Sequence, residues 1–143
     1  MASIRAATAA DASELAVLCG QLGYPADAST IARRLDAIVE HHAGAVLVAE
    51  SDEGAVVGWA EASLQRHLVH DPRVMLAGLV VAEGSRNHGV GVALLRAVEA
   101  WSREHGADEL IVRSNVLRER AHRFYQREGY VEKKRQAMFL KRL

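Results

Sequence analysis

Apolar positions along the chain change their period several times, and each change predicts an element. Residues 2–7 predict a short strand, which ends at a capping pattern that starts with Thr8. The helix that follows carries apolar side chains at helical spacing and ends at Gly23. A second helix is expected to begin at residue 29 or 30 and to end around residues 41–42.

Three apolar runs then predict three consecutive strands. They cover residues 45–49, 55–64 and 74–81, and turn-forming residues separate them. Because the connections between the runs are short, we expect neighbouring strands to be antiparallel.

After the third run the period becomes helical again. Val90, Leu94 and Trp101 lie on one stripe of an amphipathic helix that Gly106 closes. Residues 110–112 then predict a short strand, and residues 117–128 a helix. The last segment, after residue 130, alternates well enough to predict a final strand.

The predicted order is therefore βααβββαβαβ. It defines an α/β fold with a central mixed, mostly antiparallel sheet flanked by helices. At least one crossover is parallel, from residues 74–81 through the helix to residues 110–112. The length suits one domain spanning residues 1–143, with one hydrophobic core.

The segment most informative about chemistry is residues 79–91, where a strand runs into a glycine-bearing loop that opens a helix. The first turn of a helix has unpaired N–H groups and a partial positive charge, so it binds phosphate oxygens. Gly89 and Gly91 let the backbone approach a ligand, and Asn87 tolerates the left-handed region. Arg86 can add a charge-assisted phosphate contact.

Other phosphate-binding motifs do not match this loop. The pattern G-x-x-x-x-G-K-[ST] is absent, and the dinucleotide pattern G-x-G-x-x-G lacks its third glycine. Two glycines alone leave an ordinary left-handed turn before a buried helix as the alternative.

Two separate stretches resemble motifs of the GNAT superfamily of N-acetyltransferases. Residues 86–91 read R-N-H-G-V-G, which matches the pattern [QR]-x-x-G-x-[GA] of motif A. Asn115 and residues 121–130, A-H-R-F-Y-Q-R-E-G-Y, resemble motif B. The order of elements also matches, so the resemblance covers nearly the whole chain and implies the GNAT acyltransferase fold.

The resemblance implies acetyl-coenzyme A as the co-substrate. Backbone amides of residues 87–92 bind its pyrophosphate, and the open strand edge at Leu79 and Val81 pairs with the pantetheine arm, near Asn115. Tyr125 protonates the departing thiolate. The implied cofactor-binding residues are Leu79, Val80, Val81, Arg86, Asn87, His88, Gly89, Val90, Gly91, Val92, Asn115 and Tyr125.

The chemistry of Tyr125 agrees with the role of a general acid. A thiol has a pKa of about 8.5 and a phenol of about 10, so proton transfer from the phenol to the thiolate is mildly uphill in water. The transfer is feasible when the hydroxyl is positioned beside the developing negative charge. The alternative is that Phe124 and Tyr125 are aromatic core residues of an amphipathic helix.

The general base is less evident. Many GNAT enzymes carry a glutamate in the strand before motif A, where this chain has Ala77. Replacements are Glu61, His67, His70, Glu83 or a chain of water molecules, and for each of these side chains an ordinary surface position is the alternative.

Glu61 has two features that single it out. It is in phase with Trp59 and Ser63 on the predicted strand, so it can point into an acceptor cleft. Residues 59–63 also resemble aminoglycoside N-acetyltransferases, in which a nearby acidic residue holds a cationic substrate. We therefore take Glu61 as the candidate base or acceptor-binding residue.

Composition and charge disfavour several classes of binding partner. The 18 basic and 18 acidic residues cancel, so no net field favours nucleic acid or an anionic membrane. Cys19 is the single cysteine, no Cys/His spacing resembles a metal site, and no apolar run is long enough to span a membrane. These features predict a cytoplasmic protein without a metal, and the resemblance implies a homodimer.

The leading hypothesis is an enzyme that acetylates a primary amine of a small molecule by direct attack on acetyl-coenzyme A. One alternative changes the acceptor to a protein N-terminus or lysine side chain. A second alternative is a non-catalytic domain that senses coenzyme A, supported by the missing strand carboxylate.

Overall fold

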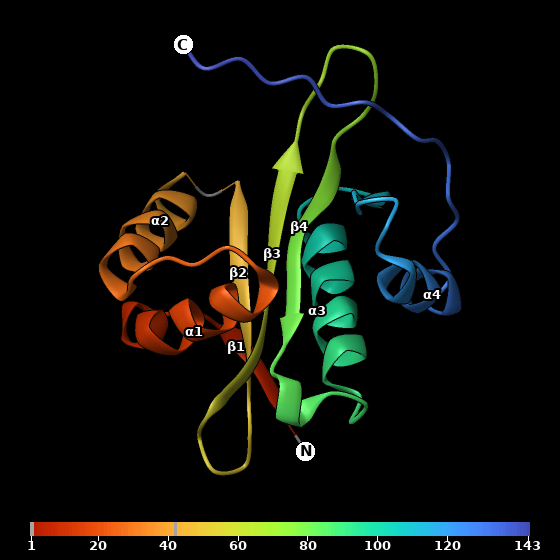
Figure 1. The fold of residues 1–143 in the computed structure, drawn as a ribbon. Coiled ribbons are helices and arrows are strands. Elements are labelled where there is room, and N and C mark those ends of the chain that lie inside the picture. The colour runs from red at the N-terminus through yellow and green to blue at the C-terminus, as the bar shows by residue number, and fades with distance from the viewer. Residues whose placement is uncertain (1, 42) are drawn as a thin grey trace. The chain divides into compact units, whose positions relative to one another are not determined.

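The computed structural model describes residues 2–41 and 43–143. The chain divides into two compact units, Met1–Val112 and Arg113–Leu143. The first unit holds the sheet and most of the helices, and the second holds one helix and the C-terminal segment (Figure 1). One domain spanning residues 1–143 stays a prediction.

The helices and strands predicted up to residue 128 are present, with bounds that differ by a few residues. His42, at the predicted end of the second helix, lies outside the described residues. The elements are β1 (Ser3–Ala6), η1 (Ala9–Asp11), α1 (Ala12–Leu22), α2 (Ala28–Glu40), β2 (Gly44–Glu50), β3 (Val56–Gln65), β4 (Arg73–Val81), η2 (Glu83–Ser85), α3 (Val90–Glu104), β5 (Leu110–Val112) and, in the second unit, α4 (Glu119–Arg127).

The sheet of the first unit has the order β1-β2-β3-β4-β5. Its first three pairings are antiparallel, and β4 pairs with β5 in parallel through the α3 crossover. Helices α1 and α2 cover one face of the sheet and α3 covers the other (Figure 1). The predicted mixed, mostly antiparallel sheet is confirmed.

The predicted capping pattern that starts with Thr8 also connects segments that are distant in the sequence. The backbone N–H of Thr8 donates to Asp11 Oδ2 at 2.8 Å. The Arg5 guanidinium donates to both Asp11 oxygens at 2.9 Å, and its Nε donates to Glu50 at 2.6 Å. The contacts with Arg5 and, to a smaller extent, Thr8 lower the pKa of Asp11. Together with the bond to Glu50, they tie β1, β2 and η1 together.

Successive residues of β3 face the two helical layers in turn. A Cβ added to Gly58 would lie 3.1 Å from Leu94 Cδ1 and 3.3 Å from Val90 Cγ1, so Gly58 faces α3. Trp59 packs in the opposite layer, in a core cluster with Leu15 and Leu18 of α1. The lack of a side chain at Gly58 lets the first turns of α3 approach the sheet closely.

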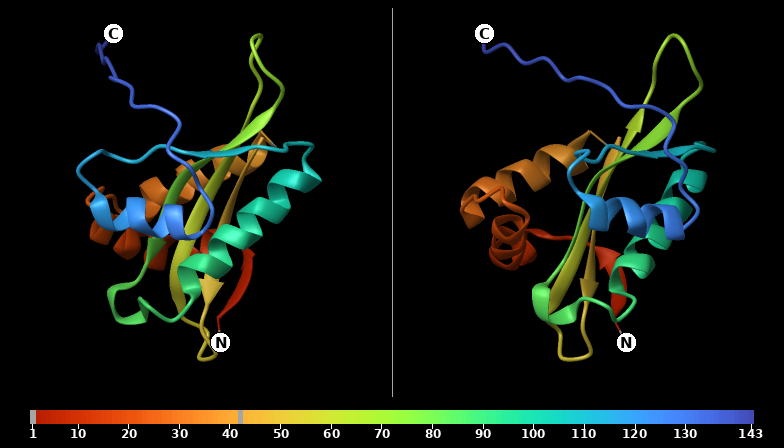
Figure 2. Two further views of the ribbon diagram at one scale, coloured as in Figure 1. Left: turned by 90° about the vertical axis from the view of Figure 1, so that its right-hand side faces the viewer. Right: turned by 45° about the vertical axis from the view of Figure 1, so that its right-hand side comes forward.

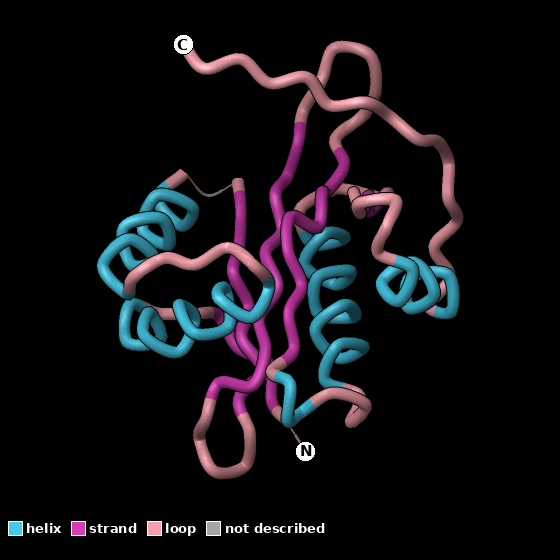
Figure 3. Tube along the Cα trace, in the orientation of Figure 1, coloured by secondary structure: helices cyan, strands magenta, loops and turns pink. Residues whose placement is uncertain are grey.

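The predicted final strand is wrong for this structure. From residue 131 to the C-terminus the described chain forms no helix or strand, and Figure 3 draws it as a loop. Alternation of apolar and polar residues makes a segment able to pair, but a strand forms only where another strand supplies its hydrogen bonds.

Candidate active site

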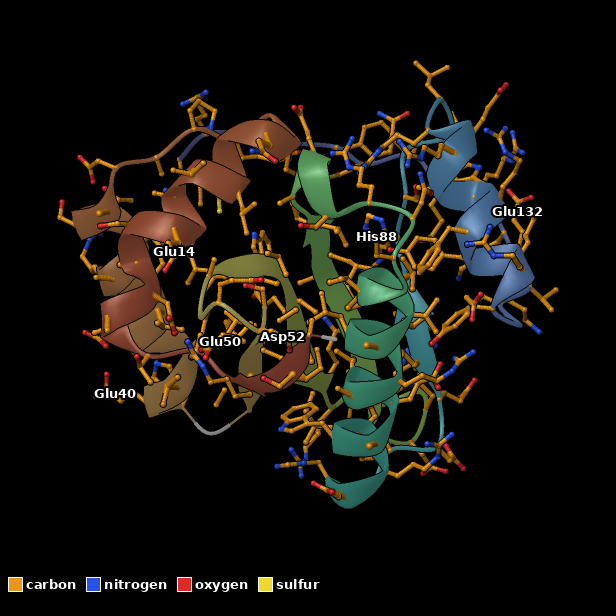
Figure 4. The ribbon with its side chains drawn as sticks, turned by 90° about the horizontal axis from the view of Figure 1, so that it is seen from below. Glu14, Glu40, Glu50, Asp52, His88 and Glu132 are labelled. Carbon is orange, nitrogen blue, oxygen red and sulfur yellow. The ribbon has the colours of Figure 1, made fainter. Side chains whose placement is uncertain are left out.

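The loop in front of α3 adopts the conformation that its sequence predicts. Asn87 has φ 67° and Gly89 has φ 80°, so both lie in the left-handed region. Asn87 is the only residue other than glycine with a positive φ in the described part of the chain. Asn87, His88 and Gly89 are exposed, and Figure 4 shows His88 in the loop beside the first turn of α3.

This loop leaves the N-terminus of α3 open to a ligand. Gly89 is the N-cap residue, and no described side chain caps the helix there. The first hydrogen bond of the helix runs from Ala93 N to Gly89 O at 3.0 Å. The N–H groups of Val90, Gly91 and Val92 therefore have no partner within the helix and can bind an anion.

A free strand edge leads into the loop. Strand β5 pairs with β4 only at Val74–Leu76, so the rest of that β4 edge has no strand partner among the described residues. Ala82 N donates to Val57 O at 2.8 Å, which places Ala82 in a hydrogen-bonded pair with β3. Because such pairs alternate, the backbone groups of Leu79 and Val81 face the free edge.

The Arg86 side chain is engaged at this edge. Its Nε donates to Val81 O at 3.2 Å, so the guanidinium holds the loop against the end of β4. The sequence suggested a phosphate contact for Arg86 but gave no indication of this second role, since the bond depends on how the intervening turn folds. Gln21 of α1 adds another link by accepting from Glu83 N at 3.3 Å.

The position where many GNAT enzymes carry a glutamate is a β-bulge in this chain. Glu61 of β3 pairs with Gly78 of β4, whereas Ala62 pairs with Leu76, so Ala77 is the extra residue of β4. The register therefore places Glu61 directly across from the residue next to Ala77. A carboxylate from β3 thus lies beside the position where β4 lacks one.

Glu61 lies on the α1 and α2 face of the sheet, two residues along β3 from Trp59. Its carboxylate is half-buried, and this burial raises the pKa of Glu61 above its ordinary value. The Glu61 carboxylate makes no hydrogen bond or ion pair within residues 2–41 and 43–143. Burial also raises the pKa of Cys19 on α1, with an electrostatic contribution from Glu61, so the carboxylate faces that helix.

Trp59 lies two residues before Glu61 on the same face of β3. The side chain is only 9% exposed, and its Nε1–H has no acceptor among the described residues. The indole ring covers the backbone of Gly78. The sequence indicated only the phase of Trp59 on the strand and gave no sign of this contact, because nothing in the local pattern links residues 59 and 78.

The other candidate bases lie farther along the chain. His67 and His70 belong to the β3–β4 connection, which extends beyond the sheet (Figure 2), and their rings are 4.5 Å apart. His67 is six residues past Glu61, about 20 Å along an extended strand. Glu83 is exposed in η2. Glu61 is thus the candidate that lies next to the bulge.

The second unit holds the remaining predicted residues. On α4, the Tyr125 ring packs edge-on against Phe124 at 5.2 Å and against Tyr130 at 5.9 Å. Burial raises the pKa of Tyr125 above its ordinary value, and the positive charge of Arg118 opposes that shift. Asn115 Oδ1 accepts from Leu117 N at 2.9 Å, so this side chain stabilises the turn before α4.

Two further properties concern the described residues as a whole. No group of three or more His, Cys, Asp or Glu side chains in them gathers as a metal-binding cluster. None of the helices formed by residues 2–41 and 43–143 is long and apolar enough to cross a membrane.

Comparison with known proteins connects this geometry to one family. The model of the acetyltransferase (GNAT) family matches residues 11–130. The chain is 36% identical over 141 residues to aminoglycoside N(6')-acetyltransferase type 1 of Stenotrophomonas maltophilia, a match that covers 96% of this chain and 91% of that protein. It is 38% identical over 78 residues to aminoalkylphosphonate N-acetyltransferase of Salmonella typhimurium, over 54% of this chain and 51% of that protein.

Solved structures show the same fold. Aminoglycoside N-acetyltransferase AAC(6')-Iy in complex with CoA superposes with a TM-score of 0.90 at 24% identity, over 100% of this chain and 96% of that chain. AAC(6')-Iy in complex with a bisubstrate analogue, CoA-S-monomethyl-acetylneamine, superposes with a TM-score of 0.89 at 24% identity, over 100% and 99% of the two chains.

Proposed function

The chain belongs to the GNAT family of acetyltransferases, and we propose that it transfers an acetyl group from acetyl-coenzyme A to the primary amine of a small molecule. The observation that carries this proposal is the uncapped N-terminus of α3 at the end of the free β4 edge. The open helix N-terminus can bind a pyrophosphate, and the strand edge that leads into it can bind an amide-bearing arm.

The donor site follows from that arrangement. The amides of residues 87–92 bind the pyrophosphate, and Arg86 holds the loop in the conformation that presents them. The backbone groups of Leu79 and the N–H of Val81 are offered to the pantetheine arm, whereas the Val81 carbonyl accepts from Arg86. One β4 amide then polarises the thioester carbonyl, because a positioned N–H donor stabilises negative charge on the carbonyl oxygen.

Glu61 serves the acceptor. Most of a primary amine is protonated at pH 7, since its pKa of about 10.4 leaves fewer than about one molecule in a thousand neutral. The Glu61 carboxylate attracts the ammonium group and takes its proton, directly or through water, which frees the nitrogen lone pair for attack on the carbonyl carbon. Its raised pKa brings the carboxylate closer to the range in which a base works at neutral pH.

Tyr125 completes the proton balance. When the carbon–sulfur bond breaks, the sulfur leaves with the electron pair, and the Tyr125 hydroxyl donates a proton to it. A raised pKa keeps this phenol protonated at neutral pH, as an acid must be. The edge-on contacts with Phe124 and Tyr130 restrict the ring to one orientation.

The acceptor is proposed as a small amine because the relative from Stenotrophomonas maltophilia, at 36% identity, is named an aminoglycoside N(6')-acetyltransferase. The half-buried Glu61 carboxylate, which has no hydrogen-bond or ion-pair partner among the described residues, suits a cationic acceptor of that kind. A protein N-terminus or lysine is the second candidate, because it presents the same kind of ammonium group to Glu61.

Thiol release from acetyl-coenzyme A tests this proposal. We expect release above the hydrolysis rate with aminoglycosides, measured beside aminoalkylphosphonates and lysine-containing peptides as competing acceptors. Release with peptides alone would move the acceptor class to proteins. Coenzyme A binding without release for any amine in the panel would favour a sensor of coenzyme A.

We also propose that the enzyme works in the cytoplasm as a homodimer. The single cysteine suits a reducing compartment. The homodimer follows from the GNAT resemblance.

A further inference from the structure

One face of β3 and β4 changes from buried to half-exposed along its length. Trp59 of β3 and Val80 of β4 are paired across the strands and lie in the core, 9% and 5% exposed. From Glu61 onward the residues on this face are half-buried, whereas Ala62 and Val74 on the opposite face stay buried. We call this half-exposed part the β3–β4 strip, and it consists of Glu61, Ser63 and Gln65 of β3 and Gly78, Met75 and Arg73 of β4.

The two ends of the β3–β4 strip carry opposite charges. Glu61 lies at the end next to the core, and Arg73 lies at the far end, where the register places it directly opposite Gln65. Because Gln65 follows Glu61 by four residues, the two charged positions are about 13 Å apart along the sheet. Among the described residues, neither charge forms an ion pair with the other or with a third side chain.

The Arg73 guanidinium lacks the partner that a buried cationic donor normally has. Its Nε is shielded from solvent and makes no hydrogen bond to any residue in the ranges 2–41 and 43–143. Buried donors are nearly always paired, and arginine keeps its charge at every physiological pH. A carboxylate, phosphate or phosphonate suits this position, because two of its oxygens accept parallel hydrogen bonds from the planar guanidinium.

The residues between the two charges suit an alkyl chain. Met75 is paired with Ser63 halfway along the β3–β4 strip, and its Sδ accepts a weak hydrogen bond from Gln65 Nε2 at 3.8 Å. A thioether is flexible and polarisable, so it packs well against methylene groups. Along the strip, a carboxylate, a thioether and a guanidinium therefore match an ammonium group, a methylene chain and an anion in that order.

We propose that Arg73 is a specificity-determining residue that binds an anionic group of the acceptor. The preferred acceptor is then a primary amine that carries a carboxylate, phosphate or phosphonate at the other end of a short chain. This inference rests on the proposed function and narrows its small-molecule amine to one chemical class. An amine without an anion, an aminoglycoside included, still reacts at Glu61 but with a higher KM.

A matched pair of acceptors tests this role. 6-Aminohexanoate and hexylamine have the same chain and differ in the carboxylate, and the chain spans much of the gap between two side chains that both reach inward. In the wild type we expect a KM for 6-aminohexanoate about 10- to 100-fold below that for hexylamine, with similar kcat. Arg73→Gln should remove the difference by raising only the KM for 6-aminohexanoate. Equal KM values for the two acceptors in the wild type would overturn the proposal.

Calorimetry gives a second readout that needs no turnover. With coenzyme A present, Arg73→Gln should raise the dissociation constant of 6-aminohexanoate by about 10- to 100-fold. Arg66→Gln removes the same charge from an exposed position just after Gln65, outside the β3–β4 strip, and should bind as the wild type does. Circular dichroism checks that each variant is folded. A dissociation constant that Arg73→Gln leaves unchanged would overturn the anion site, whereas Arg73-dependent binding without acetyl transfer would support it and count against the proposed function.

Discussion

The indole ring of Trp59 lies against the backbone of Gly78, so closely that a Cβ on Gly78 would be 2.6 Å from Cη2 and Cζ3 of the ring. Gly78 is paired with Glu61 across the strands and follows the bulge at Ala77. The ring, the missing side chain and the carboxylate therefore form one arrangement, in which the indole can cover β4 only because Gly78 has no side chain.

Gly78→Ala is expected to destabilise the protein. The added methyl group would overlap a large, rigid ring that is buried in the core, and overpacking of this kind costs about 1–3 kcal/mol. The measurement is the free energy of unfolding in urea. Gly84→Ala is the matched control, because a Cβ there meets no atom of the described residues within 4 Å. Equal stability of the two variants would mean that the ring does not pack as described.

Glu61→Gln should weaken binding of the acceptor amine and leave binding of acetyl-coenzyme A unchanged. Removing the negative charge costs a charge-assisted hydrogen bond, which is worth about 1.5–3 kcal/mol and corresponds to an increase of about 10- to 100-fold in KM for a cationic amine. Steady-state kinetics with each substrate varied in turn measures the effect. If the KM for the amine is unchanged while acetyl-coenzyme A is saturating, Glu61 is only a surface residue.

Glu61 also makes stability depend on pH in a defined direction. Burial raises its pKa in the folded protein, so the native state holds this proton at pH values where the unfolded chain has released it. The stabilisation is present below the unfolded pKa of about 4.3 and is lost as pH rises through the raised folded pKa. We expect the Tm of Glu61→Gln to equal that of the wild type in acid and to exceed it at neutral pH. A Tm difference that does not vary between pH 4 and pH 8 contradicts this.

Gly91→Trp is expected to abolish coenzyme A binding. The indole would fill the space in front of the first turn of α3, the proposed site of the pyrophosphate. Calorimetry should show a dissociation constant raised by about 100-fold or more, a loss of about 2.7 kcal/mol. Glu104→Trp, at the exposed opposite end of the same helix, should bind normally. Normal binding by Gly91→Trp would place the ligand elsewhere.

Tyr125→Phe is expected to lower kcat by about 10²- to 10⁴-fold, the usual contribution of a general acid. Affinity for coenzyme A should remain nearly unchanged, because only the hydroxyl is removed and the ring keeps its contacts with Phe124 and Tyr130. Tyr130→Phe, the same change on the neighbouring ring, should keep most of the activity. A wild-type kcat in Tyr125→Phe would assign the proton to another donor.

Much of the fold was predictable because its signals are local. Capping at Thr8, glycines that end helices and the change of period at Val90 each depend on residues a few positions apart. The left-handed conformation at Asn87 and Gly89 belongs to the same class. For that reason the phosphate loop was recognisable before any tertiary contact was known.

The surroundings of Glu61, the proposed acceptor-binding residue, were less predictable because they depend on strand register. The phase of Glu61 with Trp59 was visible in the sequence, but its position beside the bulge at Ala77 was not. A bulge shifts register by one residue, and it forms where the packing of two strands requires it. The hydrogen bond from Arg86 to Val81 and the packing of Trp59 over Gly78 also depend on tertiary contacts that the local sequence pattern does not state.

The sequence by itself determined the order of the elements up to residue 128, the loop at the start of α3 and the family, since each of these depends on neighbouring residues and on side-chain period. Only the tertiary structure decided which carboxylate lies beside the bulge of β4. It also showed that the last segment, although patterned as a strand, has no partner in the described chain. The physical reason is that pairing and burial are relations between distant segments, and a local pattern states only that a segment is able to enter them.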